Sequence, residues 1–242
     1  MLNIVVPMSG EMPFFKDIDY PYPKPLVEIN GRPMIEYLVR NLLSCGPEVR
    51  IVFLVREDHV KKFYLGNTIR LLARDQSVVQ SVPVHTGGAL CTVLMAVELI
   101  DNNQRLLIVN FDQYFTHNFR EGVEALFQTP YEGGCFVFES VHPRWSFVRT
   151  LGEDIVEASE KRPISRQAIA GVYGFSRGAD FVAAANQALL KDASHDGSFY
   201  VSSVINEMVL INKRLRAINV PAGAYHSFYS PAKIAEFTSS LA

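Results

Sequence analysis

Short apolar runs alternate with helix-like patterns through the first half of the chain, and this alternation limits the possible folds more than any other feature. The runs are short and rich in β-branched residues, which predicts buried strands at 3–6, 51–55, 77–84 and 106–109. Apolar residues at helical spacing predict helices at 33–43, from 57 onward and at 89–100. This order is typical of βαβ units, so we expect a mainly parallel sheet with a ligand site at its carboxyl edge.

The second half of the chain has a different pattern. Short strands separated by turns, at 134–140, 147–150 and 155–158, predict an antiparallel extension of the sheet. Further strands are expected at 169–175 and 215–220, and helices at 180–190, 200–211 and 231–237. No linker-like change of composition divides the chain, so we expect a single domain over residues 1–242.

Composition narrows the class of protein further. A chain of 242 residues that is 48% hydrophobic suits one globular α/β domain. The formal charge of −2 gives no reason to expect binding to nucleic acid or to an anionic membrane. The three cysteines are odd in number and scattered in apolar surroundings, which indicates reduced thiols of a cytosolic protein. We find neither a signal peptide nor a stretch that approaches a membrane span.

The first strand leads into the most informative segment. It ends at Pro7, and Gly10 then allows a ligand to approach the backbone closely. After a loop, Lys24 stands between Pro23 and Pro25, which restrict the local backbone and favour extended conformations. We therefore expect Lys24 to direct one positive charge over the end of the strand. An ordinary surface loop with a solvated lysine remains the alternative for this segment alone.

This segment resembles a known family. Pro-Lys-Pro-Leu at 23–26 and Asn-Gly-Arg-Pro-Met-Ile at 30–35 are similar to motifs of the nucleotidyltransferases that make NDP-sugars and related activated headgroups from an NTP and a phosphate ester. The likeness is closest to the branch found beside capsule and polysaccharide genes. It implies a three-layer α/β/α nucleotidyltransferase fold, GT-A-like and Rossmann-like, with a mixed, mostly parallel sheet. Within it, residues of about 1–130 would bind the nucleotide and about 131–242 the acceptor.

The resemblance implies nucleotide binding by residues from four places in the chain. They are Pro7, Met8, Ser9 and Gly10 after the first strand, Lys24, the segment Thr86, Gly87 and Gly88, and Asn110. In the family a Gly-Ala pair at the position of Gly88 lets the nucleobase lie against the backbone. Lys24 would neutralise the charge that develops at the α-phosphate during transfer. A glycine-rich helix start without a ligand remains the alternative at 86–89.

Asp112 is the candidate metal ligand. It stands just past a strand, beside Asn110 and Gln113. Mg²⁺ is commonly held by one or two carboxylates together with substrate phosphates. Relatives carry a metal-binding Asp after this strand, so the resemblance implies Mg²⁺ as the cofactor. A lone Asp in this position is also a common cap or turn residue.

The acceptor is expected to meet a second set of residues. Relatives have Glu-Lys-Pro where this chain has Glu160, Lys161, Arg162 and Pro163. The resemblance implies that Lys161 binds the acceptor phosphate, as a catalytic group with Lys24 and Asp112, and that Glu160 meets polar groups of the acceptor. Gly171 would let the acceptor approach a strand. Trp145 either packs against the acceptor or anchors a strand corner.

The chain departs from the family pattern in the phosphate loop. Relatives show Gly-x-Gly-x-Arg-Phe there, whereas this chain has Met12 at the second Gly and Phe14 at the Arg. Pro13 offers no N–H group and Glu11 would repel phosphate. Lys16 either supplies the missing charge or is a solvated surface residue.

A second departure lies near the C-terminus. Many relatives end with Trp-x-Asp-x-Gly-Thr-Pro, whose Asp is the second metal ligand, and this chain has Ser227 at that position. Serine is a poorer Mg²⁺ ligand than a carboxylate. His226 either touches a phosphate or metal or is a partly buried core residue.

These patterns predict a nucleotidyltransferase that joins an NTP and a sugar 1-phosphate, or a similar phosphorylated headgroup, with release of pyrophosphate. A catalytically impaired binding or regulatory protein on the same fold is the alternative that Phe14 and Ser227 favour. A glycosyltransferase that uses an NDP-sugar would need an Asp-x-Asp motif, which residues 112–114 do not supply. The base, the acceptor and the oligomeric state, a homo-oligomer included, stay open.

Overall fold

The computed structural model describes residues 1–10, 14–15 and 20–240. Its centre is a nine-stranded sheet in the order β5-β4-β1-β6-β11-β8-β12-β10-β9. The strands are β1 Leu2–Met8, β4 Val49–Arg56, β5 Ser77–Val82, β6 Arg105–Val109, β8 Gly133–Glu139, β9 Ser146–Leu151, β10 Asp154–Glu160, β11 Gln167–Phe175 and β12 Arg216–Asn219. Neighbouring strands are parallel from β5 to β6 and between β8 and β12, and antiparallel at the other pairings. The sheet is therefore mixed, as predicted, but four of the pairings between neighbours are parallel and four are antiparallel, so the expected parallel majority holds only from β5 to β6.

Two small sheets and eleven helical segments complete the described part of the chain. The small sheets pair β2 Glu28–Ile29 with β3 Arg32–Pro33, and β7 Gln113–Phe115 with β13 Tyr225–Ser227. The α-helices are α1 Met34–Ser44, α2 Glu57–Phe63, α3 Leu65–Ala73, α4 Ala89–Leu94, α5 Val97–Ile100, α6 Phe119–Leu126, α7 Gly178–Leu190, α8 Ser202–Leu210 and α9 Pro231–Ser240. The 3-10 helices are η1 Lys24–Leu26 and η2 Arg74–Gln76.

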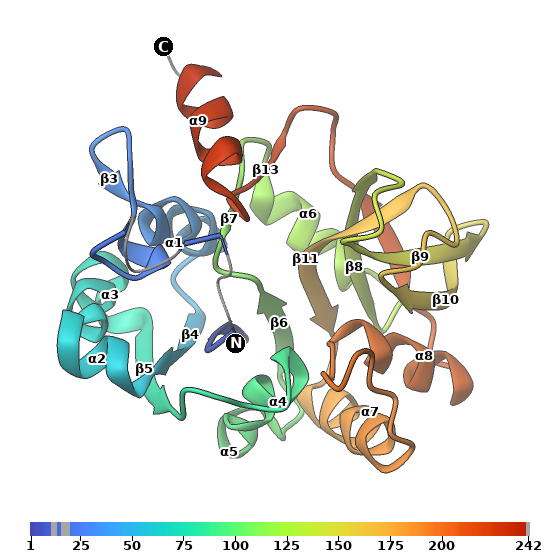
Figure 1. Cartoon of the computed structure of the whole chain (residues 1–242). Coiled ribbons are helices and arrows are strands. Elements are labelled where there is room, and N and C mark those ends of the chain that lie inside the picture. The colour runs from blue at the N-terminus through green and yellow to red at the C-terminus, as the bar shows by residue number, and fades with distance from the viewer. Residues whose placement is uncertain (11–13, 16–19, 241–242) are drawn as a thin grey trace.

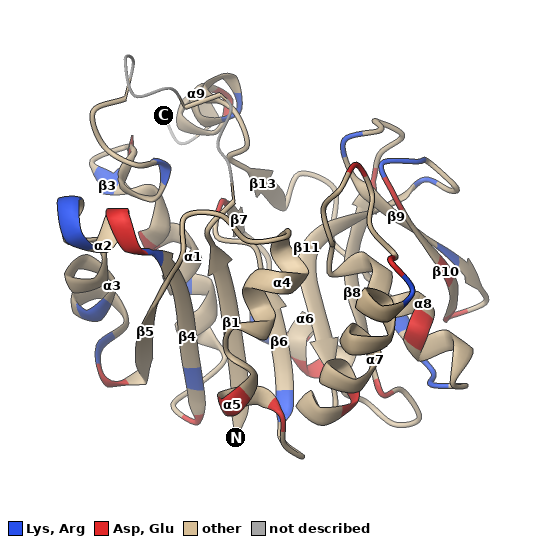
Figure 2. Ribbon diagram, turned by 60° about the horizontal axis from the view of Figure 1, so that its bottom comes forward, with Lys and Arg blue, Asp and Glu red and all other residues tan. Residues whose placement is uncertain are grey.

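Helices cover both faces of the sheet, as Figures 1 and 2 show. Side chains of β1 alternate between two apolar clusters because successive residues of a strand point to opposite faces. Ile4 and Val6 pack on the side of α1, α3, α6 and α9, whereas Val5 packs on the side of α4, α5, α7 and α8. The molecule thus has the three-layer α/β/α architecture expected from the sequence.

Several predicted helices differ in their extent. The helix expected from 57 onward divides into α2 and α3 at Tyr64, whose φ of 53° is left-handed. The helix expected over 89–100 divides into α4 and α5 at 95–96. Strands β7 and β13 and helix α6 were not predicted. The pairing of β7 with β13 matters for function, because it brings residue 227 next to residue 113.

Two further sequence predictions concern the cysteines and the possibility of a membrane-spanning helix. All three cysteines lie in the described part as free thiols, of which Cys135 is buried and Cys45 and Cys91 are partly buried. Within the described ranges, no helix has the length and apolar character needed to cross a bilayer.

Candidate functional site

A cleft of about 470 Å³ opens at the carboxyl edge of β1 and β6. It contains eight of the residues predicted to bind nucleotide or metal, namely Pro7, Ser9, Gly10, Lys24, Thr86, Gly88, Asn110 and Asp112. The sequence interpretation did not assign seven other lining residues, which are Val84, His85, Ala89, Thr92, Phe111, Ser198 and Tyr200. Met8 and Gly87 are not among the lining residues, and Met8 is fully buried. The cleft therefore brings together most of the first half of the predicted site.

A partly buried ion pair lies in the wall of this cleft. The Lys24 Nζ atom is 2.5 Å from Asp112 Oδ2. Lys24 is only 5% exposed, whereas the Asp112 side chain keeps 24% of its surface accessible. The rings of Phe15 and Phe111 lie 5.0 and 5.4 Å from the ammonium, which adds cation–π attraction. The two charged groups predicted to cooperate thus face one cleft and touch each other.

The backbone at Lys24 differs from the expectation. Pro23 is extended, with φ −63° and ψ 150°, but Lys24 begins the short 3-10 helix η1. The prediction that Lys24 itself would be extended is therefore wrong. The carbonyl of Pro23 accepts a hydrogen bond from the Leu26 amide, and this turn fixes the direction of the segment.

Gly171 lies against Asn110 and Gln113, next to the cleft. Strand β11 has an irregular register between Ile169 and Tyr173, and Gly171 within it has a φ of +62°. Its carbonyl accepts hydrogen bonds from the Asn110 amide at 2.9 Å and from Gln113 Nε2 at 3.1 Å. A Cβ atom at Gly171 would lie only 2.5 Å from Asn110 Nδ2. Gly171 does not line the cleft, and the group that approaches it closely here is Asn110.

Three hydroxyl groups hold the glycine-rich segment against the end of β1. Thr92 Oγ1 lies 2.7 Å from both Ser9 Oγ and Thr86 Oγ1. Thr86 and Thr92 also donate to the Gly88 carbonyl. Thr92 is buried on an otherwise apolar helix, and this exception to the apolar pattern is the sequence signal that could have identified it.

The same segment packs against a distant part of the chain. The Phe199 amide donates to the Gly87 carbonyl at 2.8 Å, and the Leu90 amide donates to the Phe199 carbonyl at 3.0 Å. Gly88 has a φ of +116°, and a Cβ there would lie 2.4 Å from the Phe199 oxygen. This backbone contact places Ser198 and Tyr200 in the wall of the cleft.

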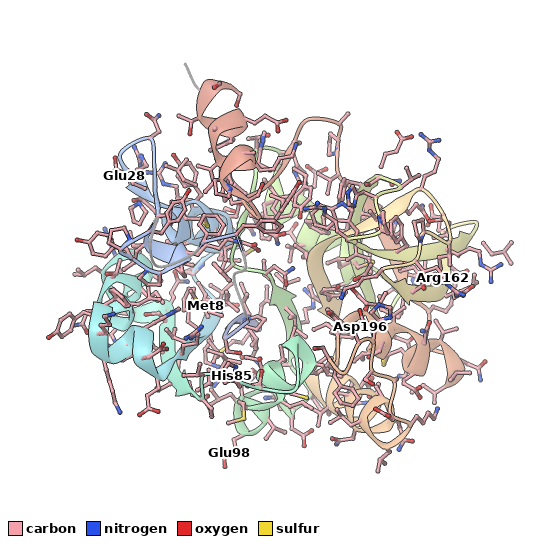
Figure 3. All side chains as sticks on the ribbon, viewed as in Figure 1. Met8, Glu28, His85, Glu98, Arg162 and Asp196 are labelled. Carbon is pink, nitrogen blue, oxygen red and sulfur yellow. The ribbon has the colours of Figure 1, made fainter. Side chains whose placement is uncertain are left out.

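Lys161 lies beside the cleft and does not line it. Its ammonium is 3.3 Å from Asp196 Oδ2 and 5.4 Å from the centre of the Tyr200 ring. Hydrogen bonding with Tyr200, reinforced by Asp196, raises the pKa of Lys161 and so stabilises its charged form further. Tyr200 connects Lys161 with the cleft that it lines. Figure 3 labels the cleft residue His85 and, to its upper right in that view, Asp196, the ion-pair partner of Lys161.

Glu160 occupies a neighbouring cavity of about 410 Å³, which shares Tyr200 with the cleft. Its Oε2 atom accepts hydrogen bonds from the hydroxyls of Ser146 and Ser202. Burial raises the pKa of Glu160, although these hydrogen bonds oppose the effect. Glu160 therefore lines a different cavity from Lys24 and Asp112.

The C-terminal segment meets the strand that follows Asp112. Ser227 pairs with Gln113, and the Phe228 amide donates to the Asp112 carbonyl at 2.8 Å. Serine thus stands beside Asp112 at the position where relatives are expected to have a second carboxylate. His226 packs against the rings of Tyr114 and Phe237, and burial lowers its pKa. Of the two roles predicted for His226, this packing matches that of a partly buried core residue.

The donor atoms near Asp112 fit magnesium in one particular way. Residues 1–10, 14–15 and 20–240 contain no group of three or more His, Cys, Asp or Glu side chains suited to a metal. Asp112 offers one partly accessible carboxylate, and Ser227 offers only a hydroxyl. Mg²⁺ is often held by one carboxylate together with phosphate oxygens and water. The residues present therefore fit Mg²⁺ that arrives with a phosphorylated ligand.

The predicted phosphate loop is only partly described. Glu11, Met12, Pro13 and Lys16 lie outside the described residues, and their predicted roles stay predictions. Phe14 is 54% exposed, and its ring meets that of Tyr229 at a centroid distance of 6.3 Å.

No family model and no curated protein matches the sequence. Solved structures do match. A nucleoside-diphosphate-sugar pyrophosphorylase from Vibrio cholerae RC9 has a TM-score of 0.83 and 21% identity, over 98% of this chain and 99% of that one. A UDP-glucose pyrophosphorylase complexed with UDP-glucose has a TM-score of 0.78 and 15% identity, over 100% and 98%. An inositol-1-phosphate CTP transferase from T. maritima has a TM-score of 0.76 and 15% identity, over 99% and 95%. The chain therefore has the three-layer fold of these nucleotidyltransferases along its full described length.

Proposed function

We propose that the protein is a nucleotidyltransferase that joins an NTP to a sugar 1-phosphate or a similar small phosphorylated headgroup. The observation that carries the proposal is the Lys24–Asp112 pair in a cleft at the carboxyl edge of the sheet. In an open α/β sheet this edge is the usual ligand site. The similarity in fold to a UDP-glucose pyrophosphorylase and an inositol-1-phosphate CTP transferase supports the same class of reaction.

In this proposal the nucleotide occupies the cleft. The segment from Pro7 to Gly10 meets the phosphates, and Thr86 to Gly88 and Asn110 meet the nucleoside. The acceptor approaches from the side of Tyr200, where Lys161 exchanges Asp196 for the acceptor phosphate. The two halves of the single domain thus bind one reactant each. The activated sugar that results would serve polysaccharide synthesis.

The reaction itself needs few groups. An oxygen of the acceptor phosphate attacks the α-phosphorus, and the bond to the β-phosphate oxygen breaks, so pyrophosphate leaves with the bonding electrons. Lys24 stabilises the negative charge on the α-phosphate with its fixed ammonium, and positioning provides most of the remaining rate enhancement. Mg²⁺, held by Asp112 and phosphate oxygens, would neutralise phosphate charge. Ionised phosphate esters need no general base to act as nucleophiles.

A pyrophosphate-release assay tests this function. The protein is mixed with each common NTP, Mg²⁺ and a panel of sugar 1-phosphates and phosphorylated alcohols. We expect release with at least one pair, and little release when either reactant is omitted. Lys161→Met should raise the KM for the acceptor more than the KM for the NTP, because Lys161 lies outside the nucleotide cleft.

One observation favours a second function, that of a binding or regulatory protein without turnover. Ser227 stands beside Asp112 where a carboxylate would complete a stronger metal site. In that case the protein would bind nucleotide but release no pyrophosphate with any acceptor. Turnover with any pair would exclude this alternative.

A further inference from the structure

A second cavity, of about 520 Å³, lies next to strand β7. Its walls include the rings of Phe138 from β8, Trp145 from the loop before β9, Tyr225 from β13 and Tyr229 from the segment before α9. The centroids of Phe138 and Tyr225 are 4.7 Å apart, and those of Trp145 and Tyr229 are 6.0 Å apart. We call this space the aromatic cavity. Its size and lining are those of a small-molecule site.

The aromatic cavity borders the residues that surround the proposed reaction. Tyr225 donates to Gln113 Oε1 at 3.3 Å, and its pKa is raised by burial and further by the nearby charge of Asp112. On the other side, the Trp145 carbonyl accepts a hydrogen bond from the Lys161 amide at 3.0 Å. The cavity is therefore linked through Tyr225 and Gln113 to the strand that follows Asp112, and through the Trp145 backbone to Lys161, whose ammonium lies at Asp196 and Tyr200. In the proposed function, an acceptor bound at this junction would place its phosphate at Lys161 and its remaining part against these rings.

One cation of the aromatic cavity, Arg144, has no carboxylate partner among the described residues. The Arg144 guanidinium carbon is 3.9 Å from the centre of the Tyr229 ring, and its Nε donates to His142 Nδ1 at 3.4 Å. Among the residues that the structure describes, no carboxylate forms an ion pair with Arg144. The other lysine or arginine of the cavity, Lys233, is paired with Glu236 at 2.6 Å.

Because this cation is a guanidinium, the ligand group that best fits it is a carboxylate or a phosphate. A guanidinium carries a fixed charge and a planar set of N–H donors that matches the two oxygens of a carboxylate or phosphate. The guanidinium lies over the Tyr229 ring and its Nε donates to His142, so that among the described residues its two terminal amino groups have no hydrogen-bond partner. Aromatic walls suit the apolar face of a ring. The cavity thus offers a surface for a ring and a fixed partner for an anion.

We infer that the acceptor is a cyclic phosphate ester with a second anionic group, remote from its phosphate, which binds Arg144 in the aromatic cavity. This inference rests on the proposed function and specifies its substrate class. A sugar 1-phosphate without a second anion would fill the cavity but leave the exposed Arg144 guanidinium to water. A charge-assisted, bidentate contact is worth about tenfold or more in affinity.

Titration calorimetry with three esters tests the inference. Glucose 1-phosphate carries no second anion, glucuronic acid 1-phosphate carries a carboxylate, and glucose 1,6-bisphosphate carries a phosphate. We expect at least one of the two anionic esters to bind about tenfold more tightly than glucose 1-phosphate, and their order identifies the anion. Arg144→Gln should remove this preference, so that the three esters bind the variant with affinities within about twofold of one another. Arg70→Gln, an exposed arginine on α3, should keep the preference.

Equal affinities for the three esters, absence of binding by both anionic esters, or a preference that survives Arg144→Gln would overturn the inference. Pyrophosphate release measured in parallel separates it from the proposed function. Turnover of glucose 1-phosphate without any preference would leave the function in place and remove only the inference. Arg144-dependent binding without turnover of any ester would support the site and count against the function.

Discussion

Lys24→Met is expected to reduce pyrophosphate release by about a hundredfold to a thousandfold, the usual effect of removing one fixed group that stabilises transition-state charge. Methionine keeps the length and apolar contacts of the lysine stem between Phe15 and Phe111, but it cannot meet the α-phosphate. The fold should remain, because the Asp112 side chain is accessible enough to be hydrated once its partner is gone. Steady-state kinetics and circular dichroism of the same preparation measure both effects.

The matched control for this prediction is Lys62→Met. Lys62 also lies over an aromatic ring, with its Nζ 5.0 Å from the centre of Phe63, but it lies on helix α2 outside the cleft. Its replacement should leave turnover within about twofold, as for other exposed charges. A Lys24→Met protein that is folded and retains turnover close to that of Lys62→Met would exclude the assigned role of Lys24.

Gly171→Ala is expected to lower the free energy of unfolding by about 2–4 kcal/mol, as the combined result of backbone strain and crowding. A φ of +62° is unfavourable for alanine, and the added Cβ would lie 2.5 Å from Asn110 Nδ2 and 2.9 Å from Gln113 Oε1. Asn110 must then move, and it lines the cleft. Nucleotide binding should therefore weaken together with stability, as urea denaturation and calorimetry would show.

Gly152→Ala separates the effect of backbone strain from the effect of crowding by the added Cβ. Gly152 has almost the same backbone conformation, with φ +61°, but an added Cβ there meets no atom within 4 Å. The expected loss is about 1–2 kcal/mol, from backbone conformation alone, with nucleotide affinity unchanged. Equal losses of stability in both variants, and no loss of affinity in Gly171→Ala, would contradict the proposed support of Asn110 by Gly171.

Local sequence patterns predicted most of the elements that position the cleft. Strand β1 could be located because it is a short, strongly apolar run. Lys24 is marked by the prolines on either side of it, and Asp112 by the apolar strand β6 that precedes it. The break between α4 and α5 could not, because residues 89–100 are apolar except for Thr92 and Glu98 and contain neither Gly nor Pro. Strand β7 was also missed, since three residues give too short a pattern to recognise.

Long-range contacts explain the remaining differences at the site. Ser198 and Tyr200 reach the cleft through the pairing of Phe199 with the segment around Gly87, which no local pattern encodes. Glu160 and Lys161 were expected to act together at the acceptor, but the backbone leaves the extended conformation between them. Glu160 ends β10 and points into its own cavity, while Lys161 has a left-handed φ of 52° and turns toward Tyr200.

The central claim is that an NTP and magnesium bind in the cleft at Lys24 and Asp112, and thermal unfolding tests it most directly. The melting temperature of the wild-type protein is measured with nucleotide alone and with nucleotide plus Mg²⁺. The same two measurements are made on Asp112→Ala. The control is Asp75→Ala, which removes an exposed carboxylate on η2. The account predicts that Mg²⁺ adds to the stabilisation by nucleotide in the wild type and in Asp75→Ala, because ligands that bind the folded state raise its stability. This increment should disappear in Asp112→Ala. The same increment in all three proteins would contradict the account.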